Sequence, residues 1–298
     1  MTFFLVDFFQ CTIEGVLTGI LYGLICVSFI IIYRTGKIFN FAQGEILIFG
    51  GYFILTFYSL LSFPLWLSLL AAFLCMAIIG LVIERAIMRP LIGQELFTTM
   101  MSTIALIFIL QGLTIVIWGG IERPFPVIFK RGAIALGPLF LKRSLFMGGL
   151  LSVVLIALLF FLFERTRQGL KLTAVSEDHQ IAQSLGISVK RSIAAGWVVS
   201  CLFSSFAAIV FLNDQAINFT ASVIGLQALP VVLVGGVESI WGAPLAGLLV
   251  GVGGAWAAFF LDPYTGGTMS KVFPFILMLV ILLIRPHGLF GWKIIERV

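Results

Sequence analysis

The sequence predicts an all-α integral membrane protein, in which eight or nine transmembrane helices form a single domain over residues 1–298. Hydrophobic residues make up 61% of the 298 residues and charged residues only 10%, and the mean hydropathy is +1.17. A soluble domain carries about 25% charged residues, so this chain has too few charges to hydrate a soluble surface. Apolar stretches recur along it instead, and a helix needs roughly 20 apolar residues to cross a bilayer.

Nine apolar stretches supply the candidate spans. They run over Phe8–Tyr33, Ile46–Leu61, Leu65–Ile83, Phe97–Trp118, Leu145–Phe163, Ser192–Asn213, Val223–Val237, Ile240–Leu261 and Val272–Ile284. Backbone polar groups in lipid must be satisfied within the protein, so we expect these stretches to be helices. A transmembrane barrel would need segments of about 10 residues with alternating polarity, which the sequence lacks. The ninth stretch is short and the second and seventh are borderline, which leaves re-entrant segments open as an alternative.

The basic residues predict an orientation, because Lys and Arg collect on the cytoplasmic side of spanning segments. With nine spans and a cytoplasmic C-terminus, twelve of the 18 basic residues lie inside and six outside. The exterior loop Ile121–Arg143 is unusually basic for its side. The net charge of +5 is thus attributed to cytoplasmic loops rather than to nucleic-acid binding. The first stretch lacks the basic flank of a cleavable signal peptide, so we expect it to be a retained span.

Two of the stretches carry small residues at every fourth position. Gly15, Gly19 and Gly23 form one stripe, and Gly247, Gly251 and Ala255 form the other. Small side chains let helices approach closely in lipid. The stripes therefore predict either tight packing within the chain or a contact with a second membrane subunit.

The segment Arg34–Gly51 places Asn40, Gln43 and Glu45 between two apolar stretches. Polar groups at membrane depth are costly unless they face water or protein, and they tend to mark a transport path. The alternative is an ordinary cytoplasmic loop.

The longest strongly charged segment is Glu164–Arg191, for which we expect a cytoplasmic location. Within it the pattern predicts a short helix with Ser176 as its N-cap and an apolar face. Glu177 and Asp178 are expected at the positive end of its dipole, Ile181, Ala182 and Leu185 on the apolar face, and Gly186 at the left-handed C-terminal position. Such a short helix is not stable alone in water, so it must dock on its own chain, on lipid headgroups or on another subunit.

Two further segments stand out towards the C-terminus. In Leu229–Gly254, Pro230 and Pro244 remove helix hydrogen bonds and the pair Gly235–Gly236 permits a break. Broken helices indicate a transport site. The final segment, Arg285–Gly291, is expected to cap the last span on the cytoplasmic side.

Motifs for catalysis are missing from the sequence. It contains no G-x-x-x-x-G-K-[ST] run, so any ATP must be bound by another chain. The two histidines, His179 and His287, suggest neither a zinc site nor a His-based catalytic site, and the four cysteines lie in apolar stretches without metal or disulfide spacing. We therefore expect no enzyme activity, no metal and no cofactor in this chain.

Taken together, four of these segments resemble the permease family of branched-chain amino-acid ABC importers. The family motif N-F-A-[HQ]-G-E is matched by Asn40–Glu45, and the C-terminal motif R-P-x-G-L-[FW]-G by Arg285–Gly291. The family's cytoplasmic loop, R-A-[x]n-A-A-x-x-x-G-I, is resembled by Leu170–Ile187, and V-x-G-G-x-G-S-x-x-G-A by Val234–Ala243. The resemblance covers nearly the whole chain. Glu238 stands where the family usually has Gly.

The resemblance implies a multi-pass protein of the bacterial inner membrane that translocates branched-chain amino acids or related small polar solutes, such as amides and urea. Its implied partners are ABC ATPase subunits that bind the ATP, a second permease subunit, identical or homologous, and an external solute-binding protein. The implied path residues are Asn40, Phe41, Gln43, Gly44, Glu45, Gly235 and Gly236. The implied ATPase-coupling residues are Ser176, Glu177, Asp178, Ile181, Ala182, Leu185 and Gly186.

The competing interpretation is a secondary transporter or channel driven by an ion gradient. It predicts acidic residues embedded in the membrane for coupling. Glu14, Glu45 and Glu238 come near such depth, each at the edge of a stretch. A membrane enzyme would need a nucleophile and a base, for which the sequence offers no convincing set.

Overall fold

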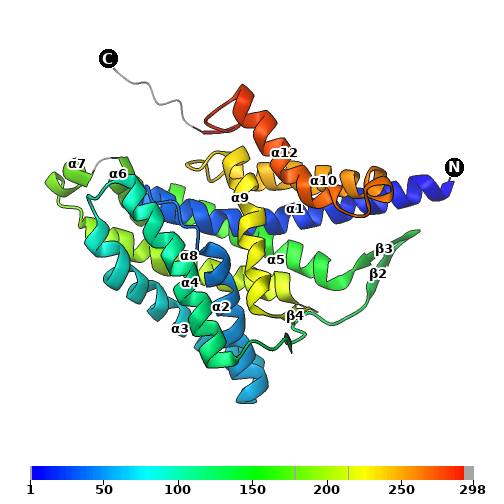
Figure 1. The fold of residues 1–298 in the computed structure, drawn as a ribbon, viewed down its shortest axis with the longest axis horizontal. Coiled ribbons are helices and arrows are strands. Elements are labelled where there is room, and N and C mark those ends of the chain that lie inside the picture. Colours follow the sequence, from blue (N-terminus) through cyan, green and yellow to red (C-terminus); the bar gives the residue numbers. More distant parts are fainter. Residues whose placement is uncertain (1, 178, 214, 292–298) are drawn as a thin grey trace. The chain divides into compact units, whose positions relative to one another are not determined.

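The computed structural model describes residues 2–177, 179–213 and 215–291, and its main elements are helices (Figure 1). Six of these are long and apolar enough to cross a membrane. They are α1 (Thr2–Gly36), α3 (Leu65–Ile83) with its extensions η2 (Glu84–Met88) and η3 (Arg89–Leu91), α4 (Leu96–Trp118), α5 (Arg143–Arg165), α8 (Val189–Leu212) and α10 (Gly242–Phe260).

The three remaining apolar stretches are also helical but shorter. They form α2 (Gln43–Leu55) with the π-helical turn η1 (Thr56–Leu60), α9 (Val223–Gly235) after the turn η4 (Phe219–Ser222), and α12 (Met269–Ile284). The all-α polytopic class is confirmed. The count of eight or nine spans stays a prediction, because α2, α9 and α12 have only 13, 13 and 16 residues.

Short elements fill the connections. The helices α6 (Arg167–Glu177) and α7 (His179–Ser184) follow α5, and α11 (Asp262–Thr265) follows α10. The strands β2 (Ala133–Leu136) and β3 (Leu139–Lys142) pair as an antiparallel hairpin, and β1 (Arg123–Pro124) pairs with β4 (Ala216–Ile217). The basic loop between α4 and α5 therefore contains one strand pairing, β2 with β3, and contributes β1 to a second pairing with β4 after α8; the apolar pattern predicted neither.

The described residues divide into two compact units. One, called here the terminal unit, contains residues 2–26, 129–156 and 227–291, and the other, the central unit, contains residues 27–128 and 157–226 with the gaps noted above. Each unit combines stretches that are far apart in the sequence. The prediction of a single domain stays a prediction.

The central unit is built around α2, α3 and α8, which pack against one another. Nearly all of α2 is buried, and Trp197 of α8 is completely buried. On another side of α2, Trp118 at the end of α4 stacks on Tyr52 with ring centroids 5.0 Å apart, and its indole N–H donates to the Thr56 hydroxyl at 2.6 Å.

In the terminal unit, α1 and α10 run side by side (Figure 1). The two predicted stripes of small residues face each other across this contact. A Cβ atom on Gly19 would lie 2.5 Å from the carbonyl oxygen of Gly247, and one on Gly15 would lie 2.7 Å from Cβ of Ala255. Both approaches are closer than real Cβ contacts. The stripes thus pack against each other within this chain, which was one of the two interpretations.

This contact predicts a strong difference between two glycine substitutions. Gly19→Ala should lower the thermal stability of the purified protein, because the added methyl group overpacks the α1–α10 contact at a cost of roughly 1–3 kcal/mol. Gly112→Ala in α4 is the matched control, since a Cβ there would have no atom within 4 Å. The melting temperature of each variant is measured in detergent, with size-exclusion chromatography as the readout. Equal melting temperatures for the two variants would contradict this packing.

Candidate functional site

The predicted polar cluster Asn40, Gln43 and Glu45 lies inside the protein. The exposed fractions of these residues are 1%, 0% and 5%. Asn40 lies in the short connection after α1, and Gln43 and Glu45 form part of the first turn of α2. An ordinary solvated loop does not have such exposures, so that alternative is wrong.

Gln43 is the centre of a hydrogen-bonded network in the central unit. Its Oε1 accepts a hydrogen bond from Nδ2 of Asn40 at 2.8 Å. Its Nε2 donates to the hydroxyl groups of Ser200 at 3.1 Å and Ser204 at 2.5 Å, both on α8. Asn40 Oδ1 in turn accepts from the backbone N–H of Ala42 at 3.1 Å. The network ties the start of α2 to the middle of α8.

The network reaches α1 through Ser200, whose hydroxyl donates to the carbonyl oxygen of Ser28 at 2.8 Å. The hydroxyl of Ser28 itself is buried and has no hydrogen-bond partner among the described residues. Buried polar groups are normally paired with protein or with ordered water. This unpaired hydroxyl is therefore a candidate partner for an ordered water molecule.

Glu45 makes a second polar contact between helices. Its Oε1 accepts a hydrogen bond from Nε2 of Gln111 on α4 at 2.7 Å, and the side chain of Ser222 also bonds to the carboxylate. The carboxylate lies in the first turn of α2, where the positive end of the helix dipole favours a negative charge. A buried acidic group in a membrane protein is a candidate for function.

Two further predicted path residues of the motif, Phe41 and Gly44, shape the backbone around this cluster. Gly44 lies directly against the carbonyl of Ser222, and a Cβ on it would be 2.9 Å from Cα of Gly225. The backbone N–H of Phe41 donates to the hydroxyl of Thr103 at 3.4 Å. Gly44 thus permits a close approach that any side chain would block.

Gly235 and Gly236, the remaining predicted path residues, belong to the terminal unit. The predicted break is present, because α9 ends at Gly235, Gly236 has φ +90°, and α10 begins at Gly242. The C-terminal motif packs onto this break. The backbone N–H of Leu289 donates to the carbonyl of Val234 at 2.8 Å, and a Cβ on Gly236 would lie 2.5 Å from the backbone nitrogen of Gly291.

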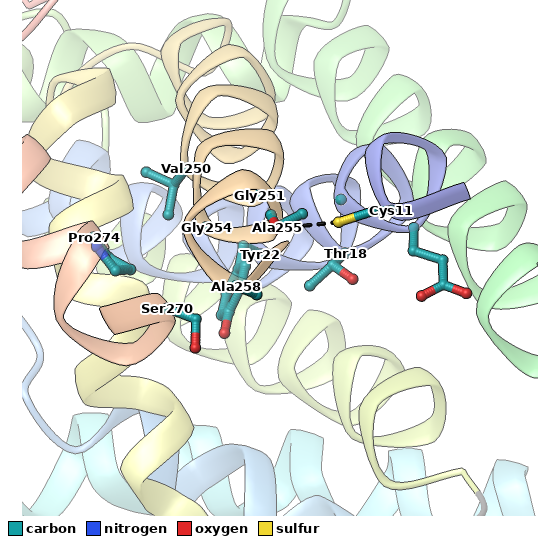
Figure 2. Close-up of a pocket in the computed structure, with 12 residues that line it drawn as sticks. Cys11, Thr18, Tyr22, Val250, Gly251, Gly254, Ala255, Ala258, Ser270 and Pro274 are labelled. Atoms are coloured by element: carbon teal, nitrogen blue, oxygen red, sulfur yellow. Dashed lines mark hydrogen bonds between the residues drawn. The ribbon is translucent and has the colours of Figure 1, made fainter. Parts of the chain in front are cut away.

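A cavity of about 280 Å³ also lies in the terminal unit, between α1, α10 and α12. Thr18 and Tyr22 of α1 and Ser270 of α12 place hydroxyl groups around it, as Figure 2 shows. Gly251 and Gly254 line the cavity from α10, and Glu14 also belongs to its lining. Glu14 was expected near membrane depth, but the apolar pattern did not predict this cavity.

The predicted coupling helix and the observed structure differ at the N-terminal end of this segment. Ser176 is not an N-cap, because it lies inside α6 and its hydroxyl donates to the carbonyl of Thr173 at 2.8 Å. Glu177 is the last residue of α6 rather than the first turn of a new helix. A hydroxyl bond back into the preceding turn competes with capping. Asp178 lies outside the described residues.

The C-terminal end of the same segment agrees with the prediction. Gly186 has φ +76°, and the backbone N–H of Ile187 donates to the carbonyl of Ala182 at 3.0 Å, as in a glycine-terminated helix. The apolar face is split, however. Ile181 and Leu185 are 60% and 71% exposed, whereas Ala182 is 1% exposed. Since α7 packs on α6 and α8, Ala182 contacts its own chain and not a partner.

The residues that complete these polar contacts were not predicted from the sequence. Ser200, Ser204 and Gln111 are separated from the motif by 66 to 161 positions. A signal was present, since Ser200 and Ser204 are spaced four apart on an otherwise apolar stretch and so share one helix face.

In the described part of the chain, no group of three or more His, Cys, Asp or Glu side chains is placed to hold a metal ion. Cys26 and Cys201 are buried, and Cys11 and Cys75 are partly exposed.

Comparison with known proteins identifies the family. Residues 11–282 match the family model for the branched-chain amino acid transport system permease component. The chain is 30% identical to the high-affinity branched-chain amino acid transport system permease protein BraD of Pseudomonas aeruginosa, with 98% of both chains covered.

Two further relatives bear LivH names. A probable branched-chain amino acid transport permease protein LivH of Methanocaldococcus jannaschii is 28% identical over 92% of this chain and 90% of its own, and the LivH permease of Salmonella typhimurium is 27% identical over 98% of both. The chain therefore belongs to the family of branched-chain amino-acid transport permeases, which are membrane components of ABC importers and not an enzyme family.

Proposed function

We propose that this chain carries branched-chain amino acids, or small polar solutes related to them such as amides and urea, across the bacterial inner membrane. The observation that carries the proposal is the burial of the polar cluster Asn40, Gln43 and Glu45, which lies in the motif that resembles the family's. Full-length relatives named for branched-chain amino-acid transport support the choice of substrate class.

The chemistry of the network suits a zwitterion or an amide. Glu45 and the side-chain oxygens of Gln43 and Ser28 accept hydrogen bonds from an ammonium or amide group, and the Ser200 and Ser204 hydroxyls can donate to a carboxylate. At present these groups mainly bond to one another. A passing solute would exchange these bonds for its own, so that no polar group is left unpaired in the membrane.

The energy for transport comes, in this proposal, from ATP bound by separate ATPase subunits. The sequence has no phosphate-binding loop. The exposed side chains of Ile181 on α7 and of Leu185, which follows α7, offer an apolar contact for such a subunit. A second permease subunit and an external solute-binding protein complete the proposed importer.

Two substitutions of Glu45 separate a charged role from a purely structural one. Glu45→Gln keeps an oxygen that accepts from Gln111 but removes the charge, whereas Glu45→Ala removes both. If the carboxylate contacts the solute, we expect both variants to lower the initial rate of labelled leucine uptake about ten-fold, which corresponds to ~1.4 kcal/mol. Membrane abundance should be unchanged.

Glu95→Gln is the control, because this carboxylate is exposed at the start of α4. Normal uptake by Glu45→Gln, with loss only in Glu45→Ala, would assign Glu45 a packing role and contradict a contact with the solute.

The ATPase contact predicts a difference between neighbouring residues of α7. Ile181→Asp should reduce co-purification of the ATPase subunit roughly ten-fold or more, because it places a charge in an apolar contact. Gln183→Asp adds the same charge to the same exposed helix but changes no apolar side chain. Ala182 is unsuitable for this test, since its burial makes a bulky substitution disrupt the chain itself. Equal retention of the ATPase by both variants would rule out α7 as the docking element.

A further inference from the structure

A second cavity, of about 610 Å³, lies in the central unit at one end of the helices. Its walls come from the end of α5, from α6 and from the first three turns of α8. None of the residues assigned above to the polar network lines it. Gly186 and Ile187 do, so the cavity adjoins the end of α7.

The polar end of this cavity is positively charged. Lys171 of α6 and Arg191 of α8 line it, together with the polar side chains of Thr166, Gln168, Ser188 and Ser192, and no acidic residue is among the described residues of its lining. A third cation is near, because the guanidinium of Arg34 lies 5.7 Å from the ring centre of Phe163, which is itself part of the wall. The arrangement favours an anion.

The other end of the cavity is apolar. Along α8 the lining changes from Arg191 through Ser192 to Ala195 and Val199. Arg191 and Val199 are eight positions apart, which corresponds to about 12 Å of helix. Leu162 and Leu172 face the cavity from α5 and α6. Because α5 and α8 are both long and apolar enough to cross a membrane, we expect the cationic end where these helices leave the bilayer and the apolar end within it.

This order of charge and apolar surface is that of a phospholipid in its leaflet. We propose that the cavity binds an anionic phospholipid, with the phosphate between Lys171 and Arg191 and the first acyl carbons along Leu162, Leu172 and Val199. Basic pockets between transmembrane helices bind anionic headgroups in this way. The first turn of α8, which has no side-chain cap, adds the positive end of its dipole to these charges but would not make a site alone.

An occupied cavity would also affect its surroundings. Ser188 precedes α8 and Arg191 lies in its first turn, so a lipid bound to them would hold the end of the segment that links α7 to α8. The proposal concerns binding only and does not depend on which solute the chain transports.

Native mass spectrometry of the purified full-length chain in detergent tests the proposal directly. The chain is titrated with phosphatidylglycerol, and with phosphatidylcholine of the same acyl chains. The test variant is Lys171→Gln/Arg191→Gln, and the matched control is Arg167→Gln/Lys190→Gln. The control removes the same number of charges from exposed positions of α6 and α8 that do not line the cavity.

We expect the wild type and the control to bind phosphatidylglycerol in preference to phosphatidylcholine, and the cavity variant to bind phosphatidylglycerol about ten-fold or more weakly, since each basic residue near a membrane surface attracts anionic lipid. Ala195→Trp, which fills the apolar end but keeps both charges, should weaken binding as well. Inorganic phosphate at millimolar concentration should leave the lipid bound, because it cannot use the apolar end.

Three results would overturn the proposal. Equal losses in the cavity and control variants would mean that the surface charge as a whole attracts lipid. Equal binding of the two lipids would remove the role of the cations. Displacement of the lipid by stoichiometric ATPase subunit would make a segment of that subunit the occupant of the cavity.

Discussion

A polar group in a membrane-embedded chain must find its partner inside the protein, and much of this structure follows from that constraint. Isolated hydroxyl groups satisfy it locally, as when Ser152 and Thr114 donate to the carbonyls of Gly148 and Leu110 one turn earlier. The buried carboxylate of Glu84 satisfies it through two hydrogen bonds from Arg89, at 3.0 and 2.9 Å. Gln43 satisfies this constraint through hydrogen bonds to another helix, and these bonds join α2 to α8. In lipid such bonds help to hold helices together, and here they join one face of α2 to one face of α8.

Small residues allow the helices to come close enough for these bonds to form. In the central unit Gly50 lies against Ser205, and Gly80 lies against the backbone of Trp197. In the terminal unit the same role falls to the stripes on α1 and α10. Lipid offers no hydrophobic force that drives helices together, so close contact and hydrogen bonding must hold them. Each unit shows both devices, although their residues come from stretches far apart in the sequence.

The sequence was sufficient to predict the nine apolar helices, the break after Gly235 and the left-handed Gly186, because each depends on local composition or on one residue's backbone freedom. It also marked Asn40, Gln43 and Glu45 as unusual, but not their partners Ser200, Ser204 and Gln111, since a single sequence does not show which helix faces meet. The errors have the same origin. Ser176 has the right chemistry for a cap, yet α6 extends through it. Ala182 belongs to an apolar face, yet α6 and α8 cover it and leave Ile181 and Leu185 exposed.

In the proposed function, the chain forms the translocation path of an importer, and ATP hydrolysed by other subunits supplies the energy. Accumulation of labelled leucine in proteoliposomes tests it most directly, with the permease assembled with its ATPase subunits and supplied with the solute-binding protein. We expect labelled leucine to accumulate against its concentration gradient only when ATP reaches the ATPase subunits. In vesicles that contain the permease alone, we expect no accumulation when an ion gradient is imposed. Accumulation driven by the ion gradient, without ATP and without ATPase subunits, would contradict it and would make this chain a secondary transporter.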